Sequence, residues 1–299
     1  MGRIGERGRE EFVGSFFNDT ATTENEIWCL SRNPGTNTEN VHWIHYDLVT
    51  AGLPENMPSS ADAVIHMAQS SRFRDFPTGV EDIFAVNTAA TARLAEWACL
   101  NDVKVFVYVS TGGIYGSSEE PLTEDHPFRS SGSLAFYQAS KYAAEIVLKA
   151  WEQRFTVVVL RPFFIYGPGQ RQEMLIPRLI NLIRQGKPIQ LQPPEGMRCN
   201  PIHVDDMAVA VEQAIDLERS IAINVAGPTV LGLEEITRII GENCGIEPMV
   251  EMLKGKSPEH MVADISRMRE ILGGPRISFS DGIARWLHSE ASDLSEGMD

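Results

Sequence analysis

The stretch Ser110-Thr111-Gly112-Gly113-Ile114-Tyr115-Gly116 ends an apolar run, and Tyr137-Gln138-Ala139-Ser140-Lys141 follows in a segment with helical periodicity. Tyr137 and Lys141 are four residues apart, so on a helix they share one face. An unperturbed tyrosine has a pKa near ~10, and a nearby ammonium lowers that pKa because it favours the phenolate. The spacing therefore predicts a proton-transfer pair, with the Thr111 hydroxyl beside it to hold a substrate oxygen.

The surrounding sequence predicts a parallel sheet. A Tyr-x-x-x-Lys spacing alone is also common on solvated helix surfaces, so the context decides between the two interpretations. Residues 103–109 are rich in β-branched and aromatic side chains and lead into a Ser-Thr-Gly-Gly loop, where catalytic groups tend to be displayed. The alternation of strands with helices over residues 26–165 predicts a doubly wound parallel α/β sheet. Strands are expected at 27–30, 41–46, 63–68, 103–109 and 156–160, and helices at 80–100 and 135–154.

A change of rhythm after Arg161 predicts a second, smaller lobe. We expect a dinucleotide-binding domain over residues 1–165, to which 200–226 return, and a substrate lobe over 166–299. Asp205 or Asp206 is expected to cap a helix that runs through Ala214. The expected elements of this half are helices at 173–185, 233–244 and 266–272 and strands at 221–225 and 248–253.

Composition narrows the functional classes. The 299 residues are 43% hydrophobic and carry a net charge of −15, which repels a phosphate backbone and argues against nucleic acid as a partner. No apolar run approaches the ~20 residues of a membrane span, so no membrane association and a cytoplasmic location are expected. The cysteines are scattered without a C-x-x-C pair, which predicts reduced structural thiols and no metal site.

Four motifs in this order resemble the extended short-chain dehydrogenase/reductases, and among them the NAD(P)-dependent sugar-nucleotide epimerase/dehydratase group. The resemblance runs from about residue 26 to the C-terminus and implies a Rossmann fold with a smaller C-terminal α/β lobe. It also implies a sugar nucleotide as small-molecule substrate and allows a homodimer. The motifs are residues 110–116, Tyr137 with Lys141, Arg161-Pro162-Phe163 followed by Tyr166-Gly167-Pro168-Gly169, and Asn200-Pro201-Ile202-His203-Val204-Asp205-Asp206.

The resemblance assigns roles to individual residues. Tyr137 takes the proton of a sugar hydroxyl while hydride passes to the nicotinamide, Lys141 holds the nicotinamide ribose, and Thr111 orients the reacting oxygen. Together with their places at strand ends, it suggests two sets of binding residues. Cofactor contacts are expected from Gly8, Gly14, Arg32, Asp47, Met67, Ala68, Gln69, Asn87, Ser110, Tyr137, Lys141 and Phe163, and substrate contacts from Gly112, Gly113, Tyr115, Phe164 and Arg198.

The N-terminal residues depart from the family pattern. The pyrophosphate of a dinucleotide needs a glycine-rich turn at a helix N-terminus. Gly8 and Gly14 take the first and third positions of Gly-x-x-Gly-x-x-Gly, whereas Glu11 takes the middle one. Residues 18–25 lack an apolar helical stripe and resemble one reading frame of a sequencing-library adapter. We therefore hypothesise an assembly artefact, and recovering the same codons from native DNA would refute it.

The residues after Thr111 favour one reaction. Dehydratases of this group carry an Asp-Glu pair there, whereas this chain has Gly112-Gly113, which favours a 4-epimerase that passes through a 4-keto intermediate. Phe164 stands where UDP-galactose-type epimerases have Asn, and Arg198 lies one residue before the family's arginine. The resemblance therefore leaves the identity of the sugar nucleotide open. An NADPH-dependent reductase of a keto-sugar or small carbonyl compound is the alternative. A non-catalytic dinucleotide sensor is the alternative of another class.

Arg32 bears on the choice of cofactor. It follows the strand expected at 27–30, where an acidic residue would bind the ribose 2′-hydroxyl of NAD and an arginine can pair with the 2′-phosphate of NADP. A solvated loop arginine explains the residue equally well. NAD and NADP both stay open, and Arg32 favours NADP.

Overall fold

The apolar run at residues 105–109 forms the centre of a parallel sheet. In the computed structural model, which describes residues 26–129, 132–255 and 257–296, β4 (Val105–Val109) is buried along its whole length. It pairs in parallel with β3 (Ala63–His66) and β5 (Thr156–Pro162), and β5 pairs with β10 (Ile221–Val225), giving the order β10-β5-β4-β3. Strands that are apolar throughout belong in a sheet covered on both faces.

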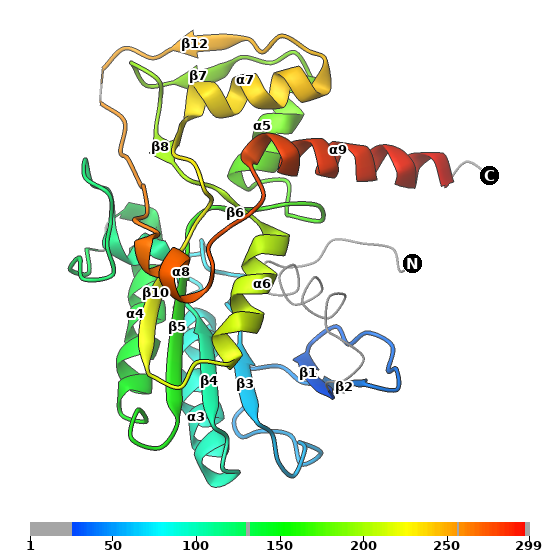
Figure 1. Ribbon diagram of the computed structural model, residues 1–299, viewed down its shortest axis with the longest axis vertical. Coiled ribbons are helices and arrows are strands. Elements are labelled where there is room, and N and C mark those ends of the chain that lie inside the picture. Colours follow the sequence, from blue (N-terminus) through cyan, green and yellow to red (C-terminus); the bar gives the residue numbers. More distant parts are fainter. Residues whose placement is uncertain (1–25, 130–131, 256, 297–299) are drawn as a thin grey trace.

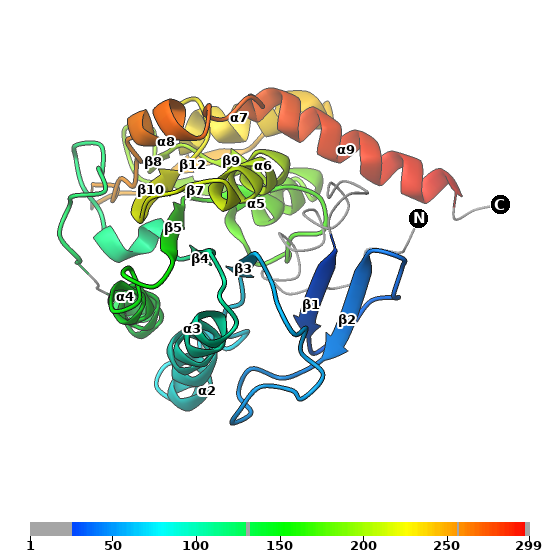
Figure 2. The same cartoon turned by 60° about the horizontal axis from the view of Figure 1, so that its bottom comes forward.

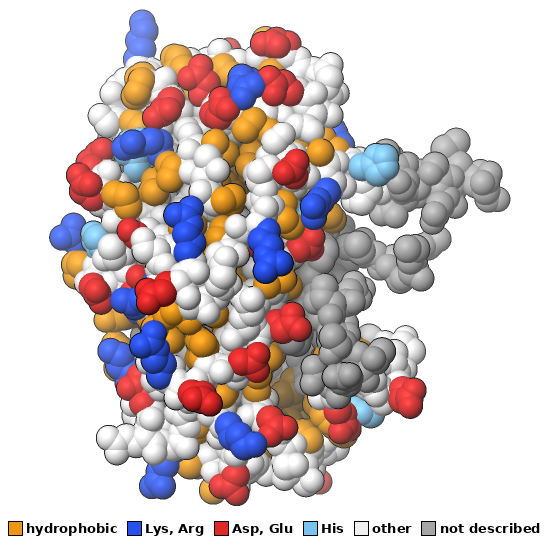
Figure 3. Space-filling model, in the orientation of Figure 1, with side chains coloured by type: hydrophobic (Ala, Val, Ile, Leu, Met, Phe, Trp, Pro, Cys, Tyr) orange, Lys and Arg blue, Asp and Glu red, His pale blue; other side chains and the backbone are white. Residues whose placement is uncertain are grey.

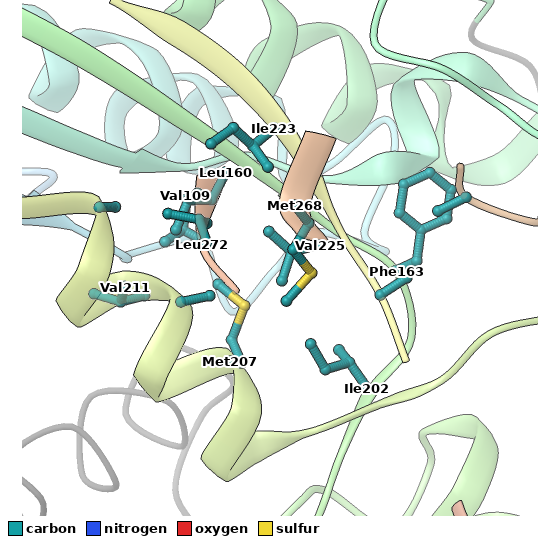
Figure 4. Close-up of a cluster of buried hydrophobic side chains, with 14 of the residues drawn as sticks. Val109, Leu160, Phe163, Ile202, Met207, Val211, Ile223, Val225, Met268 and Leu272 are labelled. Atoms are coloured by element: carbon teal, nitrogen blue, oxygen red, sulfur yellow. The ribbon is translucent and has the colours of Figure 1, made fainter. Parts of the chain in front are cut away.

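Helices cover the two faces of this sheet (Figures 1 and 2). Alternate residues of a strand point to opposite faces. Val107 and Val109 accordingly pack in one cluster with Met207, whereas Phe106 packs in another with Leu94 and Leu148. Figure 4 shows Val109 and Met207 of the first cluster. The sheet-covering elements are α2 (Val80–Phe84), the π-helical turn η1 (Ala85–Ala89), α3 (Ala90–Leu100), α4 (Ala135–Lys149), α6 (Val204–Ile215) and α8 (Ser266–Ile271).

A second pair of parallel strands lies apart from this sheet within the described ranges. β1 (Ile27–Ser31) pairs with β2 (Val41–His45), and Figure 2 shows the pair beyond the β3 edge. The parallel α/β fold is confirmed, but the expected single sheet is present in two pieces. Complete doubly wound sheets have the strand order 3-2-1-4-5-6, in which the first strand lies between the second and the fourth. In that general numbering, β1 and β2 of this protein correspond to the second and third strands, and β3 corresponds to the fourth. The division falls at that position, and the residues expected to supply the first strand lie outside the described ranges.

The smaller lobe is built around its own apolar cluster. Ile176 and Ile180 of one helix pack with Ile240 of another and with Trp286 near the C-terminus. The C-terminal helix was not predicted, whereas the strand at 221–225 joins β5 as expected. The remaining elements after β5 are β6 (Ile165–Tyr166), α5 (Leu175–Arg184), β7 (Ile189–Leu191), β8 (Arg198–Cys199), β9 (Ile202–His203), β11 (Leu231–Gly232), α7 (Leu233–Cys244), β12 (Val250–Met252) and α9 (Phe279–Glu296). Of these, β9 lies in the segment that returns to the main sheet, and its Ile202 packs in the cluster of Val107 and Met207.

The helix-capping prediction at Asp205 and Asp206 is wrong. The N-cap of α6 is His203, whose ring Nδ1 accepts from the Asp205 backbone N–H. The Asp206 carboxylate instead accepts from the backbone N–H groups of Arg276 and Ile277, at 2.9 to 3.1 Å. Asp206 therefore ties the segment before α9 to α6, because a buried carboxylate is most stable where backbone donors converge on it.

The surface and the thiols add two observations. On the face drawn in Figure 3, acidic and basic side chains are interspersed, so that face has no continuous basic stripe. Burial raises the pKa of the Cys199 thiol to about 12, and Cys199 and Cys244 form no disulfide. None of the described helices combines the length and apolar character that a membrane span requires.

Candidate active site

The predicted Tyr–Lys pair is held by the carboxyl ends of β3 and β4. Lys141 is buried in α4, and its Nζ donates to the carbonyl oxygens of Ala68 at 3.0 Å and Val109 at 2.9 Å. The Tyr137 hydroxyl donates to Gln69 Oε1 at 2.8 Å. Residues 32 to 73 positions apart in sequence therefore meet where open α/β sheets bind ligands.

A chain of hydrogen bonds fixes this helix against the rest of the sheet. Asn87, fully buried in the π-helical turn, accepts from the Ser70 backbone N–H and donates to Ser140 Oγ, both at 2.9 Å. Ser140 Oγ in turn donates to the Tyr137 carbonyl at 2.7 Å. Both polar atoms of Asn87, an expected cofactor contact, are thus used inside the protein. π-helical turns are frequent at functional sites. This one is joined through Asn87 and Ser140 to the backbone of Tyr137.

Thr111 begins the turn that follows β4. Its Oγ1 accepts from the Gly113 backbone N–H at 3.1 Å and caps the 3₁₀ turn η2 (Gly112–Tyr115). A Cβ at Gly113 would lie 3.1 Å from Gln138 Nε2 and 3.3 Å from Thr111 Oγ1, so η2 packs directly on the helix that carries Tyr137. The Thr111 oxygen accepts within the turn, which leaves its own O–H to donate.

Gly112 lies under an aromatic ring, and this predicts a sharp sensitivity to substitution. A Cβ at Gly112 would overlap the ring of buried Phe163. We expect Gly112→Ala to lower the free energy of unfolding by about 1–3 kcal/mol, as overpacking does. Equilibrium urea unfolding measures this. Gly113→Ala is the matched control, because the flexible end of Gln138 can move away from it. Equal losses in the two variants would contradict the ring contact.

Phe163 and Tyr115, a predicted cofactor contact and a predicted substrate contact, lie inside the core. Each is 1% exposed, and their rings stack at 6.1 Å between centroids. The Tyr115 hydroxyl donates to Asn224 Oδ1 at 2.8 Å and accepts from Arg161 at 2.6 Å. Burial raises the pKa of Tyr115 to about 12, against the opposing effect of Arg161. Both aromatic side chains thus lie in the core, Tyr115 from the end of η2 and Phe163 from the position after β5.

A buried ion pair underlies this region. Arg161 and Glu145 approach to 2.6 Å with 10% and 4% of their side chains exposed. Ser110, a predicted cofactor contact, donates its hydroxyl to the same Glu145 carboxylate. Glu145 follows Tyr137 and Lys141 at intervals of four on α4, so helical spacing could have revealed it as part of the same face. The sequence analysis missed it.

Phe164 adopts a conformation that is unusual for an aromatic residue. Its φ is 45°, in the left-handed region, where a bulky side chain costs about 1–3 kcal/mol and persists only if the surroundings impose it. Phe163 still donates its backbone N–H to Val225 of the main sheet, whereas the Phe164 carbonyl accepts from Ile202 of β9. The bend therefore moves the chain from the main sheet to the smaller lobe.

The predicted adenosine-side residues lie at the ends of β1 and β2. Arg32 is exposed directly after β1, with no hydrogen bond or ion pair to any residue in the described ranges. Asp47 follows β2, and its Oδ1 accepts from the Val49 backbone N–H at 3.1 Å. Met67 is half-buried after β3. The predictions for Gly8 and Gly14 fall outside the described residues.

Arg198 belongs to the smaller lobe rather than to the Tyr–Lys cluster. Its guanidinium lies 3.9 Å from Glu119, in the loop after η2, and 4.0 Å from Glu195. Its backbone N–H donates to His260 Nδ1 at 3.0 Å. No described contact joins Arg198 to Tyr137, and the guanidinium marks the edge where the loop after η2 meets the smaller lobe.

His66 is a neutral residue of the core. It is 3% exposed at the end of β3, and burial, with a further contribution from Lys141, lowers the pKa of His66 to about 3. Its ring lies 5.5 Å from that of Tyr108. His66 therefore stays uncharged through the neutral range.

These features define a class of protein: α/β enzymes with a parallel nucleotide-binding sheet and a Tyr–Lys pair on the helix beside its central strands, as in short-chain dehydrogenase/reductases. Residues 8–226 match the NAD dependent epimerase/dehydratase family, and the chain belongs to this family. The predictions of an extended short-chain dehydrogenase/reductase and of an NAD(P)-dependent enzyme are confirmed at this level.

Both sugar-nucleotide dehydratases and sugar-nucleotide epimerases are similar to the chain in sequence. It is 30% identical over 243 residues to a dTDP-glucose 4,6-dehydratase from Streptomyces griseus, covering 77% of this chain and 73% of that protein. It is 28% identical over 235 residues to a UDP-glucuronate 4-epimerase from Thermodesulfobacterium geofontis, covering 77% and 72%. Sequence similarity thus places the chain among sugar-nucleotide epimerases and dehydratases without separating the two.

Solved structures support the fold. A UDP-N-acetylglucosamine 4-epimerase from Methanobrevibacter ruminantium M1 superposes with a TM-score of 0.80 at 22% identity, covering 93% of this chain and 95% of that one. A UDP-glucuronic acid 4-epimerase from Bacillus cereus, in complex with UDP-glucuronic acid and NAD, gives 0.76 at 20% identity, covering 95% of each. At these identities the likeness establishes the shared fold.

Proposed function

We propose that this protein is an NAD(P)-dependent 4-epimerase of a sugar nucleotide. The observation that carries the proposal is the glycine pair after Thr111, where dehydratases of the group have carboxylates. The Phe163 ring closes the space over Gly112, and Gly113 faces Gln138, so neither glycine position carries a side chain that could remove water. Glu145, the carboxylate behind it, is bound to Arg161 and Ser110.

The described residues fit a dinucleotide at the carboxyl edge of the sheet. Tyr137, Lys141 and Thr111 lie around the ends of β3 and β4, and Arg32 extends from the end of β1. When bound, the dinucleotide supplies the acceptor and donor of the hydride at the sugar carbon. By resemblance, Lys141 would hold the nicotinamide ribose.

The proton is moved by the protein. Tyr137 accepts the proton of the 4-hydroxyl as the ketone forms, and returns it to the ketone oxygen when hydride comes back on the opposite face. The Thr111 O–H donates to the same oxygen and fixes its position. We further propose that residues 166–299, without the returning segment at 200–226, bind the rest of the substrate, with Arg198 near its diphosphate.

The test is a product analysis. The purified chain is incubated with NAD or NADP and a panel of UDP- and dTDP-sugars, and the products are separated by chromatography and weighed by mass spectrometry. We expect a 4-epimer of unchanged mass. A product lighter by one water would make the chain a dehydratase. Bound dinucleotide without turnover of any sugar would favour a sensor.

Arg32 leads to a prediction about the cofactor. The family is NAD-dependent, and we propose that Arg32 allows this chain to bind NADP by pairing with its 2′-phosphate. A hydrogen bond to a charged group contributes about 1.5–3 kcal/mol, so Arg32→Ala should weaken NADP binding about tenfold or more. Calorimetric titration measures this, with NAD affinity and the exposed Arg154→Ala variant as controls. Equal effects on NAD and NADP would contradict the pairing.

The same arginine supports the second candidate, an NADPH-dependent reductase. An epimerase regenerates its cofactor and gains nothing from a reduced pool, whereas a reductase consumes NADPH in proportion to product. Absorbance of NADPH during turnover separates them. Stoichiometric loss with a keto-sugar or aldehyde would favour the reductase, and constant absorbance during epimer formation would favour the epimerase.

A further inference from the structure

The hydroxyl of Tyr137 has a partner that the proposed chemistry does not yet use. Gln69 is 6% exposed, follows β3, and accepts the Tyr137 O–H through Oε1 at 2.8 Å. Its neighbour Ala68 accepts from Lys141, so one short segment holds both members of the pair. No residue in the described ranges bonds to Gln69 Nε2. The Gln69 side chain is therefore anchored at its oxygen only.

This contact suits one protonation state of the tyrosine. A phenol donates to an amide oxygen, but a phenolate has no proton to donate and would face that oxygen as a second acceptor. A base that receives the substrate proton must pass through the phenolate. The Gln69 orientation in the structure therefore matches the acid form of Tyr137 and opposes the base form.

A glutamine can resolve this conflict by itself. Its amide carries oxygen and nitrogen at nearly the same positions, so a half-turn about its last bond exchanges an acceptor for a donor. We propose that Gln69 is a positioning residue for Tyr137, accepting from the phenol through Oε1 and donating to the phenolate through Nε2 as the amide turns over. The inference rests on the proposed use of Tyr137 as the proton-transfer group.

Two titratable residues near the phenol stay neutral. From β4, Tyr108 approaches, and burial raises the pKa of Tyr108 well above its ordinary value, so it stays neutral. From β3, His66 is neutral for the reason given above. Both are uncharged while Tyr137 changes state, so neither supplies a charge that compensates the phenolate.

Charged groups farther out are engaged elsewhere. Glu145 on α4 is paired with Arg161. From the loop after β3, Arg74 lies over the Phe73 ring, and that ring lies 5.4 Å from the Tyr137 ring. Asp82 of α2 accepts from the Ser70 hydroxyl. Among the described residues, the Gln69 amide can supply a donor to the phenolate, because it already touches the Tyr137 hydroxyl.

Two substitutions at this position test the amide. Gln69→Leu keeps the approximate shape and removes both hydrogen bonds, and the phenolate loses more than the phenol because charge-assisted bonds are stronger. Gln69→Glu puts a like charge beside the phenolate and cannot donate to it. We expect the titration midpoint of Tyr137 to rise in both, by about half a pH unit in the leucine variant and by about one unit or more in the glutamate variant.

The midpoint is read directly on the protein, without turnover. Full-length chain is labelled at the tyrosine ring carbon that bears the hydroxyl and followed by NMR against pH, and Tyr137→Phe identifies the signal. Burial raises the pKa of Tyr115, of Tyr108 and of Tyr166, so the signals of these three residues change only at higher pH. Gln153→Glu, exposed at the opposite end of the sheet, controls for added charge.

The outcomes are separable. The expected order of midpoints is parent, then Gln69→Leu, then Gln69→Glu, with the acid limb of the kcat profile moving in step. Unchanged midpoints in both variants, or a fall in either, would overturn the role of Gln69. If no sugar nucleotide turns over but the midpoints shift as expected, the proposed reaction fails while the Gln69–Tyr137 coupling stands.

Discussion

If the proposed epimerisation is correct, we expect Tyr137→Phe to lower its kcat by about 10²–10⁴-fold, the usual contribution of a general acid/base. The substitution removes one oxygen, which in the structure donates to Gln69 at the carboxyl end of β3. The phenylalanine ring can keep the contact that the Tyr137 ring makes with Phe73. Because the hydroxyl acts on the reacting proton, KM should change far less than kcat.

A second tyrosine on the same helix is the matched control. Tyr142 stacks on Phe128 at 4.7 Å, and its hydroxyl has no described hydrogen-bond partner. Tyr142→Phe removes the same atom from a partly buried position on α4 and should leave kcat within a factor of about two, since it breaks no described hydrogen bond. Initial rates of epimer formation measure both variants. A Tyr137→Phe enzyme that keeps nearly full kcat would move the proton transfer to another group.

Local pattern accounts for much of this site. The continuous apolar run of β4 and the four-residue spacing of Tyr137 and Lys141 are both short-range signals, and each predicted its element with boundaries close to those observed. The parallel strand and the following helix then bring Thr111 and Tyr137 to the same edge of the sheet. These features follow from periodicity and strand direction alone.

The partners of those residues could not be predicted in the same way. Gln69 and Tyr137 are separated by 68 positions, and Asn87 and Ser140 by 53, so their pairing depends on the folded sheet and not on spacing. The prediction for the cap of α6 was wrong for a related reason. Asp206 lies near the start of α6, where a helix cap is expected, but its carboxylate accepts from the backbone N–H groups of the segment before α9 instead.

Arg161→Met lowers the free energy of unfolding by about 3–5 kcal/mol, because it leaves the Glu145 carboxylate buried without its cation. Glu145 is 4% exposed and accepts from Arg161 and from the Ser110 hydroxyl that leads into the η2 turn. Arg161 also donates to Tyr115 and to the Glu124 carbonyl. Equilibrium denaturation with urea, by fluorescence and circular dichroism together, measures the loss.

The double variant Arg161→Met with Glu145→Leu separates a lost charge pair from lost packing. Removing both ions from a buried site restores much of the stability that removing one of them costs. Lys104→Met is the exposed counterpart: Lys104 lies 3.1 Å from Asp62, with 77% and 91% of the side chains exposed, and such pairs contribute little. A double variant as unstable as Arg161→Met would assign the loss to packing around Tyr115. Recovery in the double variant would show that the ion pair holds the ends of β4 and β5 together behind Thr111 and Tyr137.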